Sequence, residues 1–168
     1  MLDSLITSKT RLRLLIKFFL NIANKGYLNG LANEFGESTN SIRKELNNLS
    51  SAGYLEKYSE NNKVVYMANA SHPLYKIIQK IVKKHLGIEE IIETVLKRIG
   101  EVNKIMILGD YAEGIDSGHI EILIVGDKVN EDYLKEITPK IEKKIKRKLS
   151  FFVSTSTLKQ KTLTIFEA

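Results

Sequence analysis

Glycine residues divide this sequence into short segments, and this division is the strongest constraint on what the chain can fold into. Segments with apolar residues at helical spacing end at or just before a glycine, whereas other apolar runs have only the length of strands. No apolar run approaches the roughly 18 residues that a transmembrane helix needs. A chain of 168 residues built from such elements forms one ordinary domain or two small ones. The dividing glycines are Gly26, Gly36, Gly53, Gly87, Gly100 and Gly109.

The first part of the chain contains three helical patterns followed by two strand-like runs. Ser8 precedes the first helical pattern as an N-cap, and Ser38 or Thr39 precedes the third. A polar turn over residues 60–63 separates the two strand-like runs and suits a hairpin. This order predicts a winged helix-turn-helix. The helices are predicted at 8–24, 28–35 and 38–52, and the strands at 54–59 and 64–68.

The second part of the chain predicts a helical connector followed by a small α/β or α+β unit. The overall fold class is therefore α+β, with a winged helix-turn-helix over 1–70, a connector over 71–100 and a C-terminal α/β domain over 101–168. The helices are predicted at 73–86, 88–99 and 131–148, the last interrupted or kinked at Pro139, and the strands at 104–108, 120–125 and 149–155.

Charge is distributed unevenly along the chain. Residues 1–100 hold 15 Lys and Arg against 9 Asp and Glu, whereas residues 101–168 hold 11 of each, and the formal net charge is +6. A basic first part beside a neutral second part indicates a polyanionic partner for the first part only. The chain has no cysteine, which excludes disulfides and thiolate metal sites. Without a secretory pattern at its start, we expect a cytoplasmic protein with no membrane association and no cofactor.

The third predicted helix carries a polar face suited to DNA. Its apolar residues Ile42, Leu46 and Leu49 fall at i, i+4 and i+7, and Glu45 is the only acid among its polar residues. Asn and Arg side chains make bidentate contacts with adenine and guanine, respectively. The tip of the hairpin adds groups that reach backbone phosphates. The candidate DNA-binding residues are Ser38, Thr39, Asn40, Arg43, Lys44, Asn47, Asn62 and Lys63.

Residues 8–68 resemble the winged-helix domain of ArsR-like and MarR-like transcription regulators. The resemblance rests on residues 31–35 (Leu-Ala-Asn-Glu-Phe), 38–46 (Ser-Thr-Asn-Ser-Ile-Arg-Lys-Glu-Leu) and 49–55 (Leu-Ser-Ser-Ala-Gly-Tyr-Leu). It implies a transcriptional regulator that binds double-stranded DNA, and symmetric operators imply a homodimer. We expect residues 73–86 and 88–99 to form much of the dimer interface or the joint between domains. A protein-interaction role is the alternative for the winged helix.

Residues 104–155 resemble the minimal form of the nucleotidyltransferase superfamily. The family pattern is a Gly-Ser turn, a Tyr-Ala-Arg-Gly-like loop and an Asp-x-Asp that opens a strand. The resemblance implies that the turn binds nucleotide phosphates and that the two Asp, with a third carboxylate on a later strand, hold Mg²⁺. The residues of this chain at those positions are Gly109, Asp110, Tyr111, Ala112, Glu113, Gly114, His119 and Glu121.

This chain departs from the nucleotidyltransferase pattern at each charged position. Asp110 replaces the serine, Glu113 the arginine, and His119 and Glu121 the two metal-binding Asp, while residues 150–154 offer no third carboxylate. One Glu is too few for Mg²⁺, so we expect a catalytically degenerate domain rather than an enzyme. The alternatives are an active nucleotidyltransferase that modifies a protein or small molecule, and an antitoxin-like partner protein. A nucleotide effector could still bind at Gly109, Asp110, Tyr111, Gly114 and Glu121.

Overall fold

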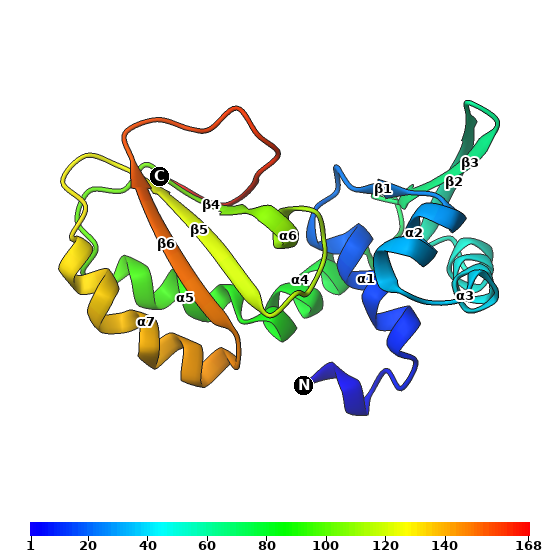
Figure 1. The fold of residues 1–168 in the computed structure, drawn as a ribbon, viewed down its shortest axis with the longest axis horizontal. Helices are drawn as coiled ribbons and strands as arrows, with labels where there is room; N and C mark the ends of the chain where they lie inside the picture. The colour runs from blue at the N-terminus through cyan, green and yellow to red at the C-terminus, as the bar shows by residue number, and fades with distance from the viewer. The chain divides into compact units, whose positions relative to one another are not determined.

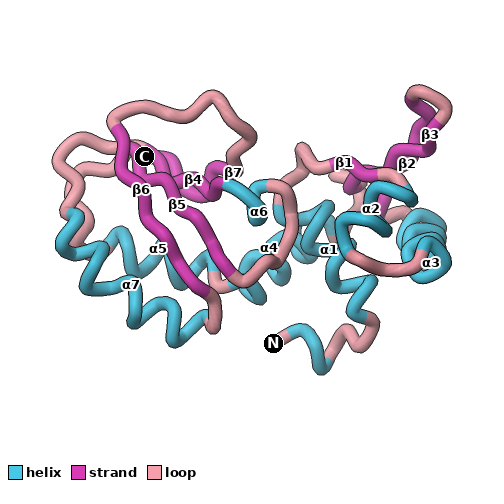
Figure 2. The backbone as a smooth tube through the Cα atoms, in the orientation of Figure 1, coloured by secondary structure: helices cyan, strands magenta, loops and turns pink.

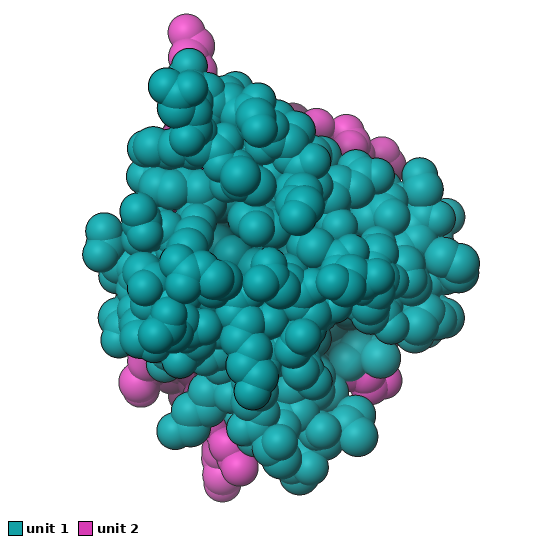
Figure 3. Space-filling model, turned by 90° about the vertical axis from the view of Figure 1, so that its right-hand side faces the viewer, with its two compact units in different colours: residues 1–82 teal, residues 83–168 magenta.

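The computed structural model describes residues 1–168 and contains two compact units, residues 1–82 and 83–168 (Figures 1 and 3). The division falls inside helix α4 (Tyr75–Leu86). Each unit has its own β-sheet with helices packed beside it (Figure 2). No helix is both long enough and apolar enough to cross a membrane.

Unit 1 is a three-helix arrangement closed by an antiparallel sheet of order β1-β3-β2. This is the winged helix-turn-helix that the sequence predicts, with the β2–β3 hairpin as the wing (Figure 1). Strand β1 was not predicted, because two residues carry no periodicity. The elements are the 3₁₀-helix η1 (Leu2–Ser4), α1 (Lys9–Leu20), β1 (Lys25–Gly26), α2 (Leu28–Phe35), α3 (Thr39–Ser51), β2 (Leu55–Glu60) and β3 (Lys63–Ala68).

Local side-chain chemistry sets the ends of these elements. Ser8 Oγ accepts a hydrogen bond from the Arg11 backbone N–H at 3.1 Å, and Ser38 Oγ accepts one from Ser41 at 3.2 Å, so both predicted caps are confirmed. Helix α1 ends at Leu20 rather than at residue 24, because the next residue is already extended. In the hairpin, Asn61 and Asn62 have φ of 50° and 61°, the left-handed values that a two-residue hairpin turn requires.

Unit 2 contains a four-stranded mixed sheet of order β6-β5-β4-β7. Strands β5 and β6 are parallel and are connected by helix α7, while β4 pairs antiparallel with β5 and β7. The predicted strands are confirmed, whereas the short helix α6 and the last strand were not predicted. The elements are α5 (Ile88–Leu96), β4 (Lys104–Leu108), α6 (Gly109–Ala112), β5 (His119–Val125), α7 (Glu131–Ile145), β6 (Lys148–Ser154) and β7 (Leu163–Glu167).

The two central strands of unit 2 are buried on both faces. Side chains alternate along them, so one face carries five fully buried isoleucines and the other carries a smaller apolar cluster. Helices α5 and α7 lie on the same side of this sheet (Figures 1 and 2). The isoleucines are Ile105, Ile107, Ile120, Ile122 and Ile124, and the cluster is Met106, Leu108, Leu123 and Val125.

Two expectations about the helices are corrected by the structure. Helix α7 is not interrupted at Pro139 but continues to Ile145, and it ends where Lys146 adopts a left-handed φ of 56°. Helix α5 packs against α7 and β7, and its apolar residues Ile88, Ile91 and Val95 are at most 1% exposed. These three residues are therefore packed within unit 2 and do not contribute to a dimer interface, whereas Leu96 at the end of the helix is 36% exposed.

A candidate nucleic-acid interface

The outward face of α3 is polar, as its periodicity predicts. Ile42, Leu46 and Leu49 are buried toward the core, whereas Arg43 and Asn47 project from the opposite side. The face of unit 1 that carries α3 and the hairpin is turned toward the viewer in Figure 3. All eight predicted DNA-binding residues are exposed: Ser38, Thr39, Asn40, Arg43, Lys44, Asn47, Asn62 and Lys63.

A groove of about 360 Å³ separates α3 from the wing. It brings together four of the predicted residues, Arg43 and Asn47 from α3 and Asn62 and Lys63 from the hairpin. The other four lie on α3 or its N-cap, outside the groove. The full lining of the groove is Tyr27, Leu28, Asn29, Arg43, Leu46, Asn47, Asn62, Lys63, Val64 and Tyr66.

Two residues of this groove were missed by the sequence argument. Tyr27 is the N-cap residue of α2, and the Lys63 ammonium lies 4.1 Å from the centre of its ring, within cation–π range. Asn29 lies in the first turn of the same helix. Both precede the helix that carries the predicted residues, so only the folded arrangement of α2 against the wing reveals them.

Two of the predicted side chains on α3 are already aligned with each other. Arg43 Nη1 donates a hydrogen bond to Asn40 Oδ1 at 3.0 Å, one turn earlier on the same helix. The contact is exposed and uses one of the five guanidinium N–H groups. The remaining donors of Arg43 stay available to a ligand in the groove.

The acidic residues of the helix-turn-helix all point away from this face. Residues 28–53 contain three acids, and each is held by α1. Glu34 accepts from Lys17 Nζ at 2.8 Å, and Glu37 accepts from Arg13 and from Thr10 Oγ1. These pairs use cations of α1 to neutralise acids of α2 and of the turn that follows it.

Glu45 corrects one feature of the sequence analysis. The helical pattern predicts Glu45 on the polar face of α3, but the residue is only 6% exposed. Its carboxylate accepts hydrogen bonds from Arg11 Nε at 2.8 Å and from Ser8 Oγ at 3.1 Å, which ties α3 to the start of α1. The outward face of α3 therefore carries Arg43 and Lys44 with no acidic residue beside them, which favours an anionic ligand.

In unit 2, the structure brings the predicted nucleotidyltransferase positions to one end of the sheet. Glu121 lies opposite Leu108 on β4 and Ser150 on β6. His119 Nε2 is 2.7 Å from Ser150 Oγ. Glu113 instead accepts a salt bridge from Lys161 at 2.8 Å, while Asp110 is exposed in the first turn of α6.

The donor set at this end of the sheet does not fit Mg²⁺. No three of the His, Asp and Glu side chains are placed so that they could share a metal ion. The carboxylate of Glu121 lies against Gly109, so closely that any side chain at position 109 would collide with it. A carboxylate in this turn repels phosphate, and a neighbouring histidine–serine pair supplies no hard anionic ligand for Mg²⁺.

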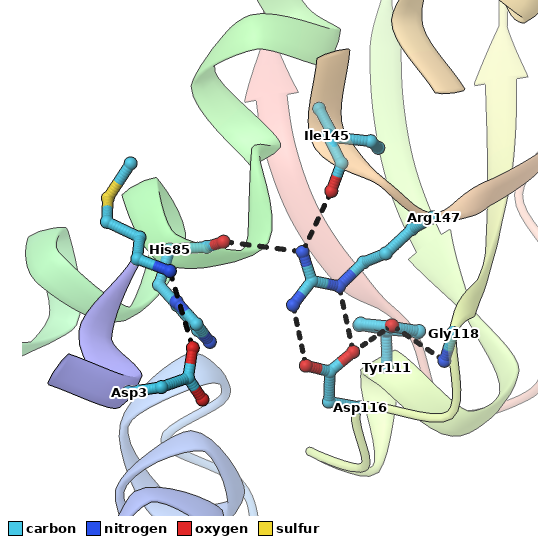
Figure 4. Close-up of polar contacts among 8 residues, drawn as sticks. Asp3, His85, Tyr111, Asp116, Gly118, Ile145 and Arg147 are labelled. Carbon is cyan, nitrogen blue, oxygen red and sulfur yellow. Dashed lines mark hydrogen bonds and ion pairs between the residues drawn. The ribbon is translucent and has the colours of Figure 1, made fainter. Parts of the chain in front are cut away.

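Tyr111, predicted to contact a nucleotide, belongs instead to a partly buried polar network (Figure 4). Its side chain is fully buried, its hydroxyl donates to Asp116, and the hydroxyl oxygen accepts from the Gly118 N–H at 3.0 Å. Gly114 is buried as well. Because Tyr111 and Gly114 face the interior, the proposed nucleotide pocket loses two of its five residues.

Arg147 completes this network from the turn before β6. Its Nε and Nη2 donate to the two oxygens of Asp116 at 2.8 and 2.7 Å, and its Nη1 donates to the Ile145 carbonyl at 3.1 Å. Partial burial acts to raise the pKa of Asp116, but hydrogen bonds from Arg147 and Tyr111 outweigh it, so that the pKa lies below its usual value. Burial, followed by the bond to Asp116, raises the pKa of the Tyr111 hydroxyl. This network was not predicted, since Arg147 lies 31 positions from Asp116 in the sequence.

Comparisons with known proteins give distant structural likenesses and no sequence relatives. No protein-family model matches the chain, and no curated protein matches it in sequence. The AntR antimony-specific transcriptional repressor matches 52% of this chain and 71% of its own, at 15% identity and a TM-score of 0.38. Sso10a-2, a DNA-binding protein from Sulfolobus solfataricus, matches 52% of this chain and 88% of its own, at 16% identity and a TM-score of 0.36. The transcriptional regulator BldR from Sulfolobus solfataricus matches 59% of this chain and 68% of its own, at 12% identity and a TM-score of 0.39. Likenesses at this level identify no family for the chain.

Proposed function

We propose that this chain is a DNA-binding transcriptional regulator that inserts α3 into the major groove and places the hairpin against the sugar–phosphate backbone. One observation carries the proposal. Arg43 and Asn47 of α3 line a single groove with Lys63 of the wing, on a face from which the acids of the helix-turn-helix are withdrawn toward α1. Such a surface offers base-reading and phosphate-binding groups side by side.

The chemistry of the individual residues supports this docking. The major groove of B-DNA admits one α-helix, and Arg43 and Asn47 are the residue types that read guanine and adenine edges. Ser38, Thr39 and Asn40 lie at the N-terminus of α3, where hydroxyl and backbone N–H groups favour phosphate oxygens. Lys63 is at the start of β3 and carries a single compact charge suited to the backbone.

For unit 2 we propose a nucleotidyltransferase-like domain without catalytic activity. The position of Glu121 at the end of the sheet, against the turn at Gly109, supports the likeness, and the histidine at position 119 and the lack of a carboxylate in residues 150–154 support the loss of chemistry. Because the Glu121 carboxylate lies against Gly109 and would repel phosphate, a nucleotide effector at that turn gains no support. The measurement that checks this proposal is incubation with labelled nucleoside triphosphates and Mg²⁺ or Mn²⁺, and labelled product that Glu121→Ala abolishes would contradict it.

A selection experiment tests the regulatory proposal. The purified chain is incubated with a pool of random DNA duplexes, and the bound duplexes are recovered and sequenced over several rounds. A homodimer, which we also propose, is expected to enrich a motif of two related half-sites, because protein symmetry is mirrored in the operator. Arg43→Ala in a parallel selection is the control and is expected to lose preference at one position of each half-site. Recovery of no common motif by either protein would contradict the proposal.

A further inference from the structure

Strand β6 forms an open edge of the sheet in unit 2. The Lys148 N–H donates to the Gly118 carbonyl and the Ser154 carbonyl accepts from Gly126, so these residues direct their backbone groups toward β5. Because backbone groups alternate along a strand, Leu149, Phe151 and Val153 direct theirs to the open side. The Leu149 N–H donates to the Glu142 carboxylate at 2.8 Å, whereas Phe151 and Val153 present both N–H and C=O to the edge.

This edge lacks the protection that the other strand edges of the molecule carry. Strand β2 contains Glu56, Lys57 and Glu60, and β7 has an irregular register with β4 and a salt bridge from Glu167 to Lys104. Residues 149–155 contain no charge, no proline and no glycine. Phe152 and Val153 are 45% and 36% exposed. Natural proteins block unpaired strands of this kind unless the strand has a partner.

We infer that β6 pairs antiparallel with β6 of a second copy of this chain, about a two-fold axis at Phe152. Residues 150–154 read Ser-Phe-Phe-Val-Ser, in which the order of polar and apolar residues is symmetric about Phe152. An antiparallel pairing centred there places Phe152 beside its own counterpart, Ser150 beside Ser154 of the second copy, and Phe151 beside Val153 of the second copy. Along this contact, apolar side chains lie beside apolar ones and serine lies beside serine, with an aromatic pair at the centre.

The backbone of β6 suits the same register. With Phe152 at the axis, Phe151 and Val153 of the second copy form a hydrogen-bonded pair that exchanges both N–H···O=C bonds. The symmetry-related pair does the same, and the Leu149 N–H keeps its bond to Glu142. Every open group of Phe151 and Val153 is then used.

The charges favour a second copy in this orientation. Lys148 is the only charged residue of β6, and it stands at one end. Antiparallel pairing about Phe152 separates the two Lys148 residues by eight strand positions, roughly 26 Å at 3.3 Å per residue, whereas parallel pairing would set them side by side. This inference rests on the homodimer proposed above and assigns its interface, while DNA binding is tested separately, since no residue of α3 or the wing takes part.

Single cysteines test the pairing directly, because the chain has none of its own. In the proposed register, two Phe152→Cys chains bring their Cα atoms to about 4.5 Å, within the range of a disulfide. Ser154→Cys is the matched control, since it lies on the same strand and the same face but roughly 13 Å from its own counterpart. Under mild oxidation we expect Phe152→Cys to form covalent dimers and Ser154→Cys to remain monomeric. A mixture of Ser150→Cys and Ser154→Cys is expected to form the heterodimer, and equal cross-linking of Phe152→Cys and Ser154→Cys would overturn the inference.

Solution mass provides an independent measurement. Light scattering of the intact chain is expected to give twice its mass of 19.1 kDa. Phe152→Lys should give the monomer, whereas Leu158→Lys, at an equally exposed side chain outside the strand, should leave the dimer intact. Ile77→Lys tests the exposed side of α4 as the competing interface. A monomeric wild type, or a dimer that Ile77→Lys dissociates and Phe152→Lys does not, would overturn the pairing. If Phe152→Lys does not fold, the cysteine comparison decides.

Discussion

At the scale of single residues, Asp116 and Arg147 form a bidentate ion pair with little solvent access, at 25% and 13% side-chain exposure. Exposed ion pairs contribute about 0–1 kcal/mol, and the removal of one partner from a buried pair costs about 3–5 kcal/mol. We expect Asp116→Asn to lower the free energy of unfolding by about 2 kcal/mol, between these limits. The exposed Glu136–Lys140 pair on α7 provides the control, where Glu136→Gln should leave the free energy of unfolding nearly unchanged. Urea denaturation at neutral pH measures the free energy of unfolding of both variants. Equal losses in Asp116→Asn and Glu136→Gln would contradict a stabilising role for the Asp116–Arg147 pair.

The lowered pKa of Asp116 also predicts a dependence of stability on pH. A carboxyl whose pKa is lower in the folded state contributes stability above its unfolded pKa of about 3.9, and this contribution is lost as the pH falls through its folded pKa. The difference in free energy of unfolding between wild type and Asp116→Asn should therefore shrink as the pH falls below about 4. Urea midpoints of both proteins between neutral and acid pH test this, and a constant difference across that range would refute it.

Lys63 should contribute affinity for DNA without sequence preference. Its ammonium lies at the wing over the Tyr27 ring, 4.1 Å from the ring centre, and carries a compact charge suited to a phosphate. We expect Lys63→Ala to weaken binding to all duplexes alike and to reduce the slope of log affinity against log salt by about one. Lys57→Ala, an exposed lysine on the neighbouring strand and outside the groove, is the control. A loss confined to one duplex sequence would count against a purely phosphate-binding role.

The residues that the sequence predicted correctly are those whose position follows from local periodicity. Ile42, Leu46 and Leu49 are buried and Arg43 is exposed because a helix of 3.6 residues per turn separates them. Glu45 violates this pattern because its partner Arg11 lies 34 positions away. The network of Tyr111, Asp116 and Arg147 has the same origin, with Arg147 31 positions from Asp116. Pairing at such separations depends on the tertiary fold, which no local pattern encodes.

At the scale of elements, the turn of the β2–β3 hairpin sets the geometry of the wing. Asn61 and Asn62 both adopt positive φ, which asparagine tolerates and glycine favours. We expect Asn62→Gly to preserve or raise stability, and Asn62→Val to lower it by about 1–3 kcal/mol, because a β-branched residue is strained at this φ. Thermal denaturation of the two variants tests this pair of effects.

The same two variants separate the shape of the wing from its chemistry. Asn62→Gly removes the side chain and keeps the turn, so a loss of DNA affinity in this variant identifies a direct contact. If only Asn62→Val loses affinity, then the wing acts through its shape. Equal stabilities of the two variants would contradict the turn assignment itself.

Elements of ordinary length with capping residues or a clear turn were predictable, and short or pairing-dependent elements were not. The capping residues Ser8 and Ser38 predicted the starts of α1 and α3, and the polar turn over residues 60–63 predicted the hairpin. Strand β1 has two residues and exists because Lys25 and Gly26 pair with β3. Strand β7 likewise depends on its pairing with β4, and α6 is a single turn after a buried strand. Such elements are stabilised by neighbours rather than by their own sequence.

At the scale of the whole molecule, the chain divides into two compact units of different electrostatic character. Unit 1 holds 11 Lys and Arg against 6 Asp and Glu, whereas unit 2 holds 15 against 14, so five of the six net positive charges lie in unit 1. Within unit 1, the acids of the helix-turn-helix pair with α1 and leave the outward face of α3 to Arg43 and Lys44. The central claim is therefore that unit 1 binds DNA through α3, and that the exposed residues of unit 2 take no part in this binding.

Fluorescence anisotropy against a selected duplex and a scrambled duplex, at several salt concentrations, tests this claim most directly. We expect Arg43→Ala and Asn47→Ala to weaken binding to the selected duplex by about 1–3 kcal/mol and to relax base preference. Glu113→Ala and His119→Ala, at exposed positions of unit 2, are the matched controls and should bind like wild type. Equal affinities of wild type, Arg43→Ala and Asn47→Ala on both duplexes would contradict the account and leave the winged helix as a protein-binding module.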